Sequence, residues 1–143
     1  MGLDQFLNAK RFIWSNEADL AVTVASLFPE LKERQVREVI VEAIYWRKAN
    51  AIHKWFVDNV QNGEDNCGNY YVSREQLVEL RTLIQEALES SDASKLPACS
   101  GFFFGSTDID SDYWNKLENT ATELDKILAE FDDKWDFEYT SSW

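Results

Sequence analysis

Apolar and polar residues follow two spacings along the chain, and these predict strands and helices in one α+β structure. Residues 135–139 alternate strictly between aromatic and acidic side chains, which is typical of a strand with one buried and one solvated face. Residues 3–14 mix apolar and polar side chains without a clean period, and we interpret them as a short strand. Residues 36–45 combine helix-like apolar spacing with many β-branched residues. We favour a strand that ends near Tyr45 and keep a helix as the alternative.

Four other segments have the spacing of amphipathic helices. The first follows two cap-type residues and ends at Pro29, and the third opens with a capping box formed by Ser73 and Gln76. The predicted helices span residues 17–28, 46–60, 73–90 and 111–131. Turn-forming residues indicate loops over 61–72 and 96–106.

The length and composition favour one compact domain over residues 1–143. A length of 143 residues lies within the range of about 100–200 that is usual for a domain. Hydrophobic residues make up 45% and aromatic residues 14% of the chain, which excludes global disorder. We therefore predict an α+β domain with three to four helices packed on a small sheet that includes the C-terminal strand.

Three further observations bear on where the protein works. No apolar run approaches the length of about 18 residues that a transmembrane helix needs, and the first residues do not have the pattern of a secretory signal. Two cysteines do not make a disulfide framework, so we expect Cys67 and Cys99 to be free thiols in a reducing cytoplasm.

The charge is strongly acidic but unevenly distributed. The formal net charge is −12, which argues against direct nucleic-acid binding and against broad attraction to anionic membranes. Residues 31–54 nevertheless contain six Lys and Arg against three Glu, whereas residues 107–143 contain eleven acids against three Lys. The basic and the acidic segment suggest two different kinds of partner.

Two segments contain candidate residues for an anionic ligand. Cationic and aromatic side chains in residues 45–56 suit a phosphate or carboxylate, provided that they are not neutralised by neighbouring acids on a surface helix. Residues 100–106 place three Phe between two Gly, where backbone N–H groups suit an anion and a ring suits a base. We expect Phe102 and Phe104 to be core residues. The candidate ligand-binding residues are Trp46, Arg47, Lys48, Asn50, His53, Phe103, Gly105 and Ser106.

The acidic segment supports an alternative, in which carboxylates imitate a nucleic-acid backbone and dock on a basic surface of a partner. Its candidate partner-binding residues are Asp108, Asp110, Asp112, Glu118 and Asp125. The first three resemble the start of a calcium loop, but Tyr113 and Asn119 stand where the loop needs Gly and Glu. His53, Cys67 and Cys99 are too scattered for a structural zinc site, so we predict no metal and no cofactor.

Several motifs resemble a family of small, uncharacterised proteins of tailed bacteriophages. They are MGLD at 1–4, YWRKANAIHKWF at 45–56, Asp65-x-Cys67, SGFFFGS at 100–106 and a terminal SSW at 141–143. The resemblance implies a phage protein that acts in the host cytoplasm. It gives no mechanism.

Three functional hypotheses follow. The first is a non-catalytic binding protein that counters a host defence function by binding an anionic, nucleotide-like small molecule. The second is an acidic inhibitor that docks on a host defence protein. The third is a small hydrolase-type enzyme with His53 as general base near Ser106 or Cys67, and we favour a non-catalytic protein over it. The exposed edge of a terminal strand also allows two copies to pair.

Overall fold

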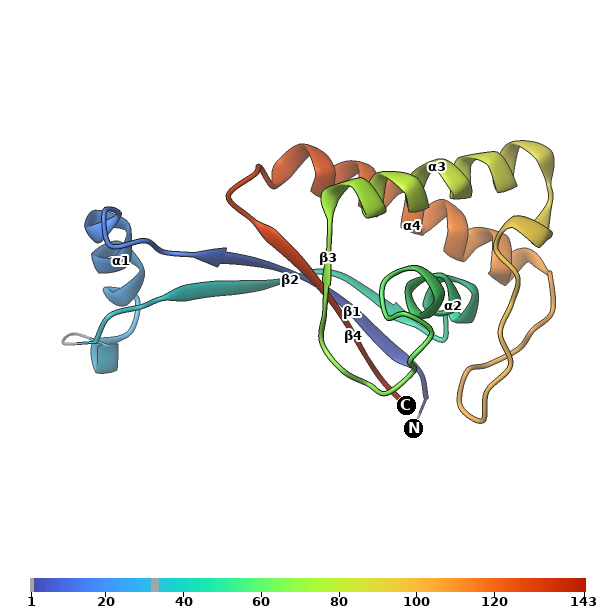
Figure 1. Cartoon of the computed structure of the whole chain (residues 1–143), viewed down its shortest axis with the longest axis horizontal. Coiled ribbons are helices and arrows are strands. Elements are labelled where there is room, and N and C mark those ends of the chain that lie inside the picture. The colour runs from blue at the N-terminus through green and yellow to red at the C-terminus, as the bar shows by residue number, and fades with distance from the viewer. Residues whose placement is uncertain (1, 32–33) are drawn as a thin grey trace.

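Four antiparallel strands form one sheet, and three of the helices lie together on one side of it (Figure 1). A computed structural model describes residues 2–31 and 34–143 of the chain. The strands are β1 (Asp4–Phe12), β2 (Glu38–Arg47), β3 (Tyr70–Val72) and β4 (Asp136–Ser142). Their order across the sheet is β2-β1-β4-β3, so the two terminal strands occupy its centre. The prediction of an α+β fold with a C-terminal strand in the sheet is confirmed.

Four α-helices connect or flank the strands. They are α1 (Ala18–Ala25), α2 (Asn50–Asn59), α3 (Arg74–Ser90) and α4 (Ser111–Glu130), with short 3-10 turns at Pro29–Leu31 and Ala93–Lys95. The predicted capping box begins α3, where the Ser73 hydroxyl accepts from the Gln76 backbone and the Gln76 side chain accepts from the Ser73 backbone. The Asp110 side chain caps α4 by accepting from the Tyr113 N–H, without the reciprocal bond of a capping box.

The core lies between the sheet and helices α2, α3 and α4. Inward positions of β1 alternate with outward ones, and β4 presents aromatic side chains to the same side. Phe56 of α2 stacks on Tyr139 of β4 with ring centroids 3.9 Å apart, while Leu80 of α3 and Leu124 of α4 are fully buried in the same cluster. This packing fixes the end of the sheet where α2 begins.

The opposite end of the sheet is a projecting arm, which we define as residues 11–41 without the two that the structure does not describe. The outer parts of β1 and β2 extend past the end of β4 and carry α1 at their tip, far from the other helices (Figure 1). Helix α1 has no buried residue, and Ile13 is the single buried side chain among the described residues of the arm.

Two predictions about the segments after β1 need correction. The helix predicted over 46–60 begins only at Asn50, because Trp46 and Arg47 still belong to β2 and Lys48 turns the chain with a left-handed φ of 54°. The Gln5 side chain holds this turn by bonding both the N–H and the carbonyl of Ala49. The loop predicted over 61–72 also contains β3, a three-residue strand paired with β4.

Candidate functional site

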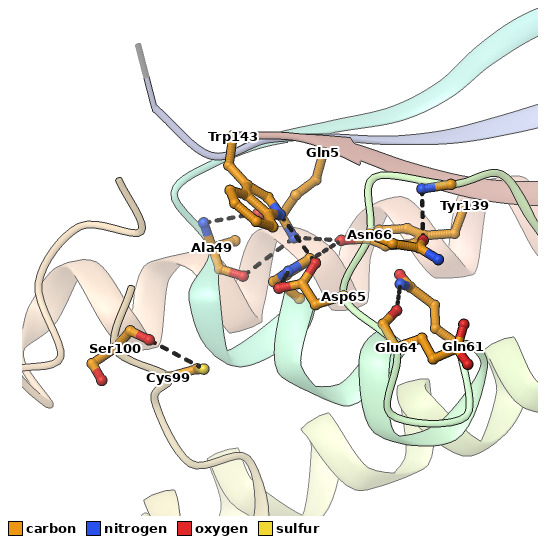
Figure 2. Close-up of polar contacts among 12 residues, drawn as sticks. Gln5, Ala49, Gln61, Glu64, Asp65, Asn66, Cys99, Ser100, Tyr139 and Trp143 are labelled. Atoms are coloured by element: carbon orange, nitrogen blue, oxygen red, sulfur yellow. Dashed lines mark hydrogen bonds and ion pairs between the residues drawn. The ribbon is translucent and has the colours of Figure 1, made fainter. Parts of the chain in front are cut away.

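A chain of hydrogen bonds between polar side chains runs from the core to the surface at the end of the sheet where α2 begins, which we call its inner end (Figure 2). Gln5 Nε2 lies 3.2 Å from the Tyr139 hydroxyl, which lies 2.7 Å from His53 Nδ1. The other ring nitrogen of His53 lies 3.0 Å from Asp65 Oδ2, and Asp65 Oδ1 accepts from the Trp143 indole at 3.0 Å. Five residues from four separate parts of the sequence therefore form one network.

The local structure explains how these side chains meet. His53 lies on the buried face of α2, one turn after the strand-to-helix turn that Gln5 holds, and only 1% of it is exposed. Asp65 follows α2 in the loop that leads to β3, while Tyr139 points inward from β4. Each polar atom here depends on a neighbour from another element, because buried polar groups without partners are costly.

The partners assign the protons in this network. A carboxylate only accepts, so His53 Nε2 carries the proton toward Asp65, and His53 Nδ1 accepts from the Tyr139 hydroxyl. In this neutral tautomer every one of these atoms has a partner, and Asp65 keeps its negative charge. Burial raises the pKa of Tyr139 well above its usual value near 10, so the hydroxyl remains a donor.

The network ends in a surface cleft of about 450 Å³. The cleft is lined by Asp65, Cys99, Ser100, Gly101, Phe102, Phe103, Phe104 and Trp143. Phe102 is 94% exposed and Trp143 is 47% exposed, so two aromatic rings meet solvent near a partly exposed carboxylate. Its volume lies within the range of about 300–1,000 Å³ that is usual for ligand pockets.

The side chain of Asn50 holds the loop that forms one wall of the cleft. Its amide nitrogen donates to the carbonyls of Phe104 and Ser106 at 3.1 and 2.9 Å, and its oxygen accepts from the Cys99 N–H at 3.1 Å. The loop is also tied to the residue that precedes β1, because the Leu3 N–H donates to the Phe103 carbonyl at 3.0 Å. Both N–H groups of the Asn50 amide and its oxygen are thus engaged within the chain.

The two glycines of this loop are each required by the structure, for different reasons. A Cβ on Gly101 would lie 2.5 Å from Cγ of Phe104, so the buried ring of Phe104 packs directly on the glycine. Gly105 has a φ of +86° and lies against the Lys48 side chain. The prediction that Phe104 is a core residue is confirmed, whereas the same prediction for Phe102 is wrong.

The structure distributes the predicted ligand-binding residues over several places. Trp46 is buried and donates its indole N–H to Thr120 at 2.8 Å. Arg47 is on the exposed side of the sheet, where it pairs with Asp4 at 3.1 Å. Phe103 lines the cleft. The helix predicted over 46–60 would have placed Arg47 and Lys48 in its first turn, near His53. Because α2 begins only at Asn50, neither residue belongs to it.

Lys48, Asn50 and Ser106 do come together, in a cavity of only about 30 Å³ at the start of α2. The same cavity is lined by Asp108, Asp110 and Asp112, which were predicted for the alternative, protein-binding function. These three carboxylates outnumber the two lysines of the lining, Lys48 and Lys116, which disfavours an anion. The space suits water and excludes a nucleotide.

The remaining acidic candidates differ in how far they are neutralised. Asp112 pairs with Lys116 one turn along α4, and Asp125 forms a two-pronged ion pair with Arg81 of α3 at 2.8 and 3.0 Å. Asp110 is occupied in capping α4. Glu118 is exposed on α4, and Asp108 is exposed before it. Part of the predicted acidic surface is thus engaged within the molecule.

Sequence reasoning missed four members of the site, namely Gln5, Asp65, Tyr139 and Trp143. A signal was present for Gln5 and Tyr139, because both carry polar atoms at strand positions whose neighbours two residues away are buried. Ser141 gives this signal on one side only, since Tyr139 is buried and Trp143 is exposed, and its buried hydroxyl has no partner among the described residues. Nothing local marks Asp65, whose role depends on contacts with residues 12 and 78 positions away.

Metal-binding and membrane-spanning features are not found in the described residues. Within 2–31 and 34–143, no three His, Cys, Asp or Glu side chains gather in a way that could hold a metal ion. Cys67 and Cys99 are free thiols. None of the helices in the described part of the chain is long and apolar enough to span a membrane. Comparison with protein-family models, curated proteins and solved structures finds no match to this chain.

Proposed function

We propose that the chain is a non-catalytic binding protein that works by contacting another protein through its arm. The observation that supports this proposal is the number of large apolar side chains exposed on the arm. Trp14 is 65% exposed and Leu27 is 69% exposed, and five more large apolar residues of the arm are also exposed. Those five are Phe12, Val22, Phe28, Ile40 and Val41.

An apolar surface of this kind favours a protein partner. Single exposed apolar residues are common on protein surfaces, but contiguous groups mark places where another molecule binds. The apolar groove between α1 and the following turn is lined by Ala21, Val22, Ala25, Phe28 and Pro29. The arm contributes almost nothing to the core of the domain, so the stability of the fold does not explain these side chains.

The residues around His53 support the non-catalytic part of the proposal. A general base needs a free nitrogen within reach of a substrate, whereas both ring nitrogens of His53 are bonded within the chain and its ring is buried. The Ser106 hydroxyl accepts from the Asp108 N–H, so it too has a structural use. These contacts favour a structural role for the residues that an enzyme would need.

The chemistry of the arm indicates what the partner offers. Arg34 and Arg37 are exposed beside the apolar residues. Asp19, Glu30 and Glu38 are exposed on the arm as well. A complementary surface is therefore apolar at its centre and carries both signs of charge at its rim. If the chain is a phage protein, as its motifs suggest, the partner is a host protein, and occupying it is how the chain would counter a host defence function.

A capture experiment with a matched control tests the proposal. The purified chain is immobilised and exposed to a bacterial lysate, in parallel with the variants Trp14→Ser, Leu27→Ser and Val78→Ser. We expect one protein to be retained by the unmodified chain and by Val78→Ser, whose exposed apolar residue lies on α3, and to be lost with both arm variants. The captured protein is then purified and must bind the chain directly.

Two outcomes would contradict the proposal. Capture that is equal for all four proteins would show that the arm is not the contact surface. A retained protein that proves to be a second copy of this chain, with an oligomer that Trp14→Ser dissociates in native mass spectrometry, would assign the arm to self-association instead.

A further inference from the structure

The cleft at Trp143 combines two features that together recognise a positive charge. Two of its lining rings, Phe102 and Trp143, are exposed to solvent. The Asp65 carboxylate lies in the same cleft. Aromatic faces attract cations, and a carboxylate adds a full negative charge at short range.

The Asp65 charge is not neutralised within the described residues. Its one basic neighbour within ion-pair distance is His53, at 3.0 Å. His53 Nδ1 accepts a hydrogen bond from the Tyr139 hydroxyl and so carries no proton of its own, which makes His53 the neutral tautomer. If His53 carried a second proton, the Tyr139 oxygen would accept from both Gln5 and His53, and its own hydroxyl proton would lose its partner.

The position of the carboxylate is fixed before any ligand arrives. Each of its oxygens already accepts one N–H, from His53 on one side and from Trp143 on the other. Each oxygen retains a second lone-pair direction, so the pair still suits a donor with two parallel N–H groups. A preorganised acceptor of this kind loses little side-chain entropy on binding.

We propose that this cleft binds an organic cation, namely the guanidinium group of an arginine side chain presented by another molecule. The guanidinium offers the two parallel N–H donors that match a carboxylate, and its flat face stacks on aromatic rings. The net charge of −12 favours the approach of a cation over that of an anion. The proposal goes beyond the function proposed for the arm, which lies at the other end of the sheet, and does not depend on it.

The test uses the isolated chain and two probes of nearly the same shape, one with a charged guanidinium and one with a neutral ureido group that has fewer N–H donors. N-acetyl-arginine amide and its neutral isostere N-acetyl-citrulline amide are titrated into the ¹⁵N-labelled chain. The indole N–H resonance of Trp143, assigned by its loss in Trp143→Phe, reports on the cleft directly. We expect the arginine probe to shift this resonance in a saturable manner, and the citrulline probe to bind about ten-fold more weakly or not at all.

Variants separate a cation site from nonspecific attraction. Asp65→Asn keeps the size of the side chain and removes its charge. We expect it to lower the affinity for the arginine probe about ten-fold. Phe102→Leu keeps an apolar side chain and removes the ring, which should lower the affinity for the arginine probe about three-fold. Phe102→Trp should bind the probe at least as tightly as the unmodified chain. Tyr71→Leu, an exposed aromatic residue on β3, is the matched control and should change nothing.

Each alternative result has a defined meaning. Equal responses to the arginine and citrulline probes, or an unchanged affinity in Asp65→Asn whose spectrum shows an intact fold, would overturn the proposal. A titration with spermidine distinguishes the source of the cation. Tighter binding of spermidine than of the arginine probe would overturn the assignment to an arginine side chain and show a site for free polyamines. Failure of the arm to capture a partner leaves these titrations unaffected.

Discussion

Trp143 donates its indole N–H to Asp65 at 3.0 Å, and this bond joins the residue after β4 to the loop after α2. His53 binds the second oxygen of the same carboxylate from the core side. The carboxylate therefore stands between a buried histidine and a half-exposed tryptophan. The hydrogen-bond network and the surface cleft meet at this one side chain. A change that disturbs the network should therefore also move the carboxylate that lines the cleft.

Removing the Tyr139 hydroxyl should destabilise the domain. Tyr139→Phe removes the partner of His53 Nδ1 and one of the two partners of Gln5 Nε2, which still donates to the Ala49 carbonyl. We therefore expect the free energy of unfolding to fall by about 1–3 kcal/mol. Urea titration at neutral pH measures this change. The control is Tyr71→Phe, whose ring is exposed, and a change of equal size in both variants would contradict the role of the network.

The raised pKa of Tyr139 leads us to expect a loss of stability at high pH. Burial raises the pKa of Tyr139 in the folded chain, so between about pH 10 and that raised value the folded chain keeps a proton that the unfolded chain has released. The stabilisation is complete below about pH 10 and declines as the pH rises, by up to about 1.4 kcal/mol per pH unit. Urea titrations at pH 9, 10 and 11 should show this slope.

Two variants identify which group produces the alkaline slope. Tyr139→Phe should reduce it, and Tyr71→Phe should leave it unchanged. Burial also raises the pKa of Tyr113, with a contribution from Asp92, so part of the slope should survive in Tyr139→Phe. A slope of full size in Tyr139→Phe would show that other groups carry the effect.

Asn50→Ala should loosen the loop that walls the cleft. The change removes the partners of the Phe104 and Ser106 carbonyls and of the Cys99 N–H, and we expect a loss of about 2–3 kcal/mol in the free energy of unfolding. Hydrogen exchange in residues 99–106 should become faster at the same time. Asn119→Ala, on the exposed side of α4, is the control and should change stability by less than about 0.5 kcal/mol.

A methyl group on Gly101 should also destabilise the loop. Gly101→Ala places a Cβ at 2.5 Å from Cγ of Phe104, so the buried ring must move, at a cost of about 1–3 kcal/mol. The control Ser100→Ala changes an exposed neighbour in the same loop. Thermal unfolding of the two variants compares them directly, and equal melting temperatures would mean that the ring adapts without strain.

The strands and long helices could be predicted from the sequence because their patterns are local. The alternation in β4, the capping box of α3 and the apolar stripe of α4 each arise within one element. The three residues of β3 could not be predicted, since they form a strand only through pairing with β4. The start of α2 was placed too early because Trp46, although in β2, has the spacing of the helix that follows.

The ambiguity over 36–45 has a specific structural cause. Ile44 pairs with Leu7 and Val41 pairs with Ala9, so both lie on the same side of the sheet although they are three residues apart. A β-bulge at Ala43 adds the extra residue between them, which turns a spacing of two into a helix-like spacing of three. The candidate site was harder still, because its network depends on contacts between distant residues.

The arm should also be the least protected part of the fold. Helix α1 has eight residues and none of them is buried, so it opens without disturbing the core. Hydrogen-exchange mass spectrometry should therefore show faster exchange in Ala18–Ala25 than in α3 or α4. Comparable protection in all three helices would indicate that the arm is covered in solution, and addition of a true partner should slow exchange in α1 alone.

Strand β1 belongs to both ends of the molecule. Gln5 holds the network near the cleft, and Phe12 lies at the base of the exposed apolar tip. At about 3.3 Å per residue, the two are roughly 23 Å apart along a strand that is paired on at least one side throughout. Occupants of the proposed cleft site and of the arm would thus not compete for space, and the length of β1 would set the distance between them.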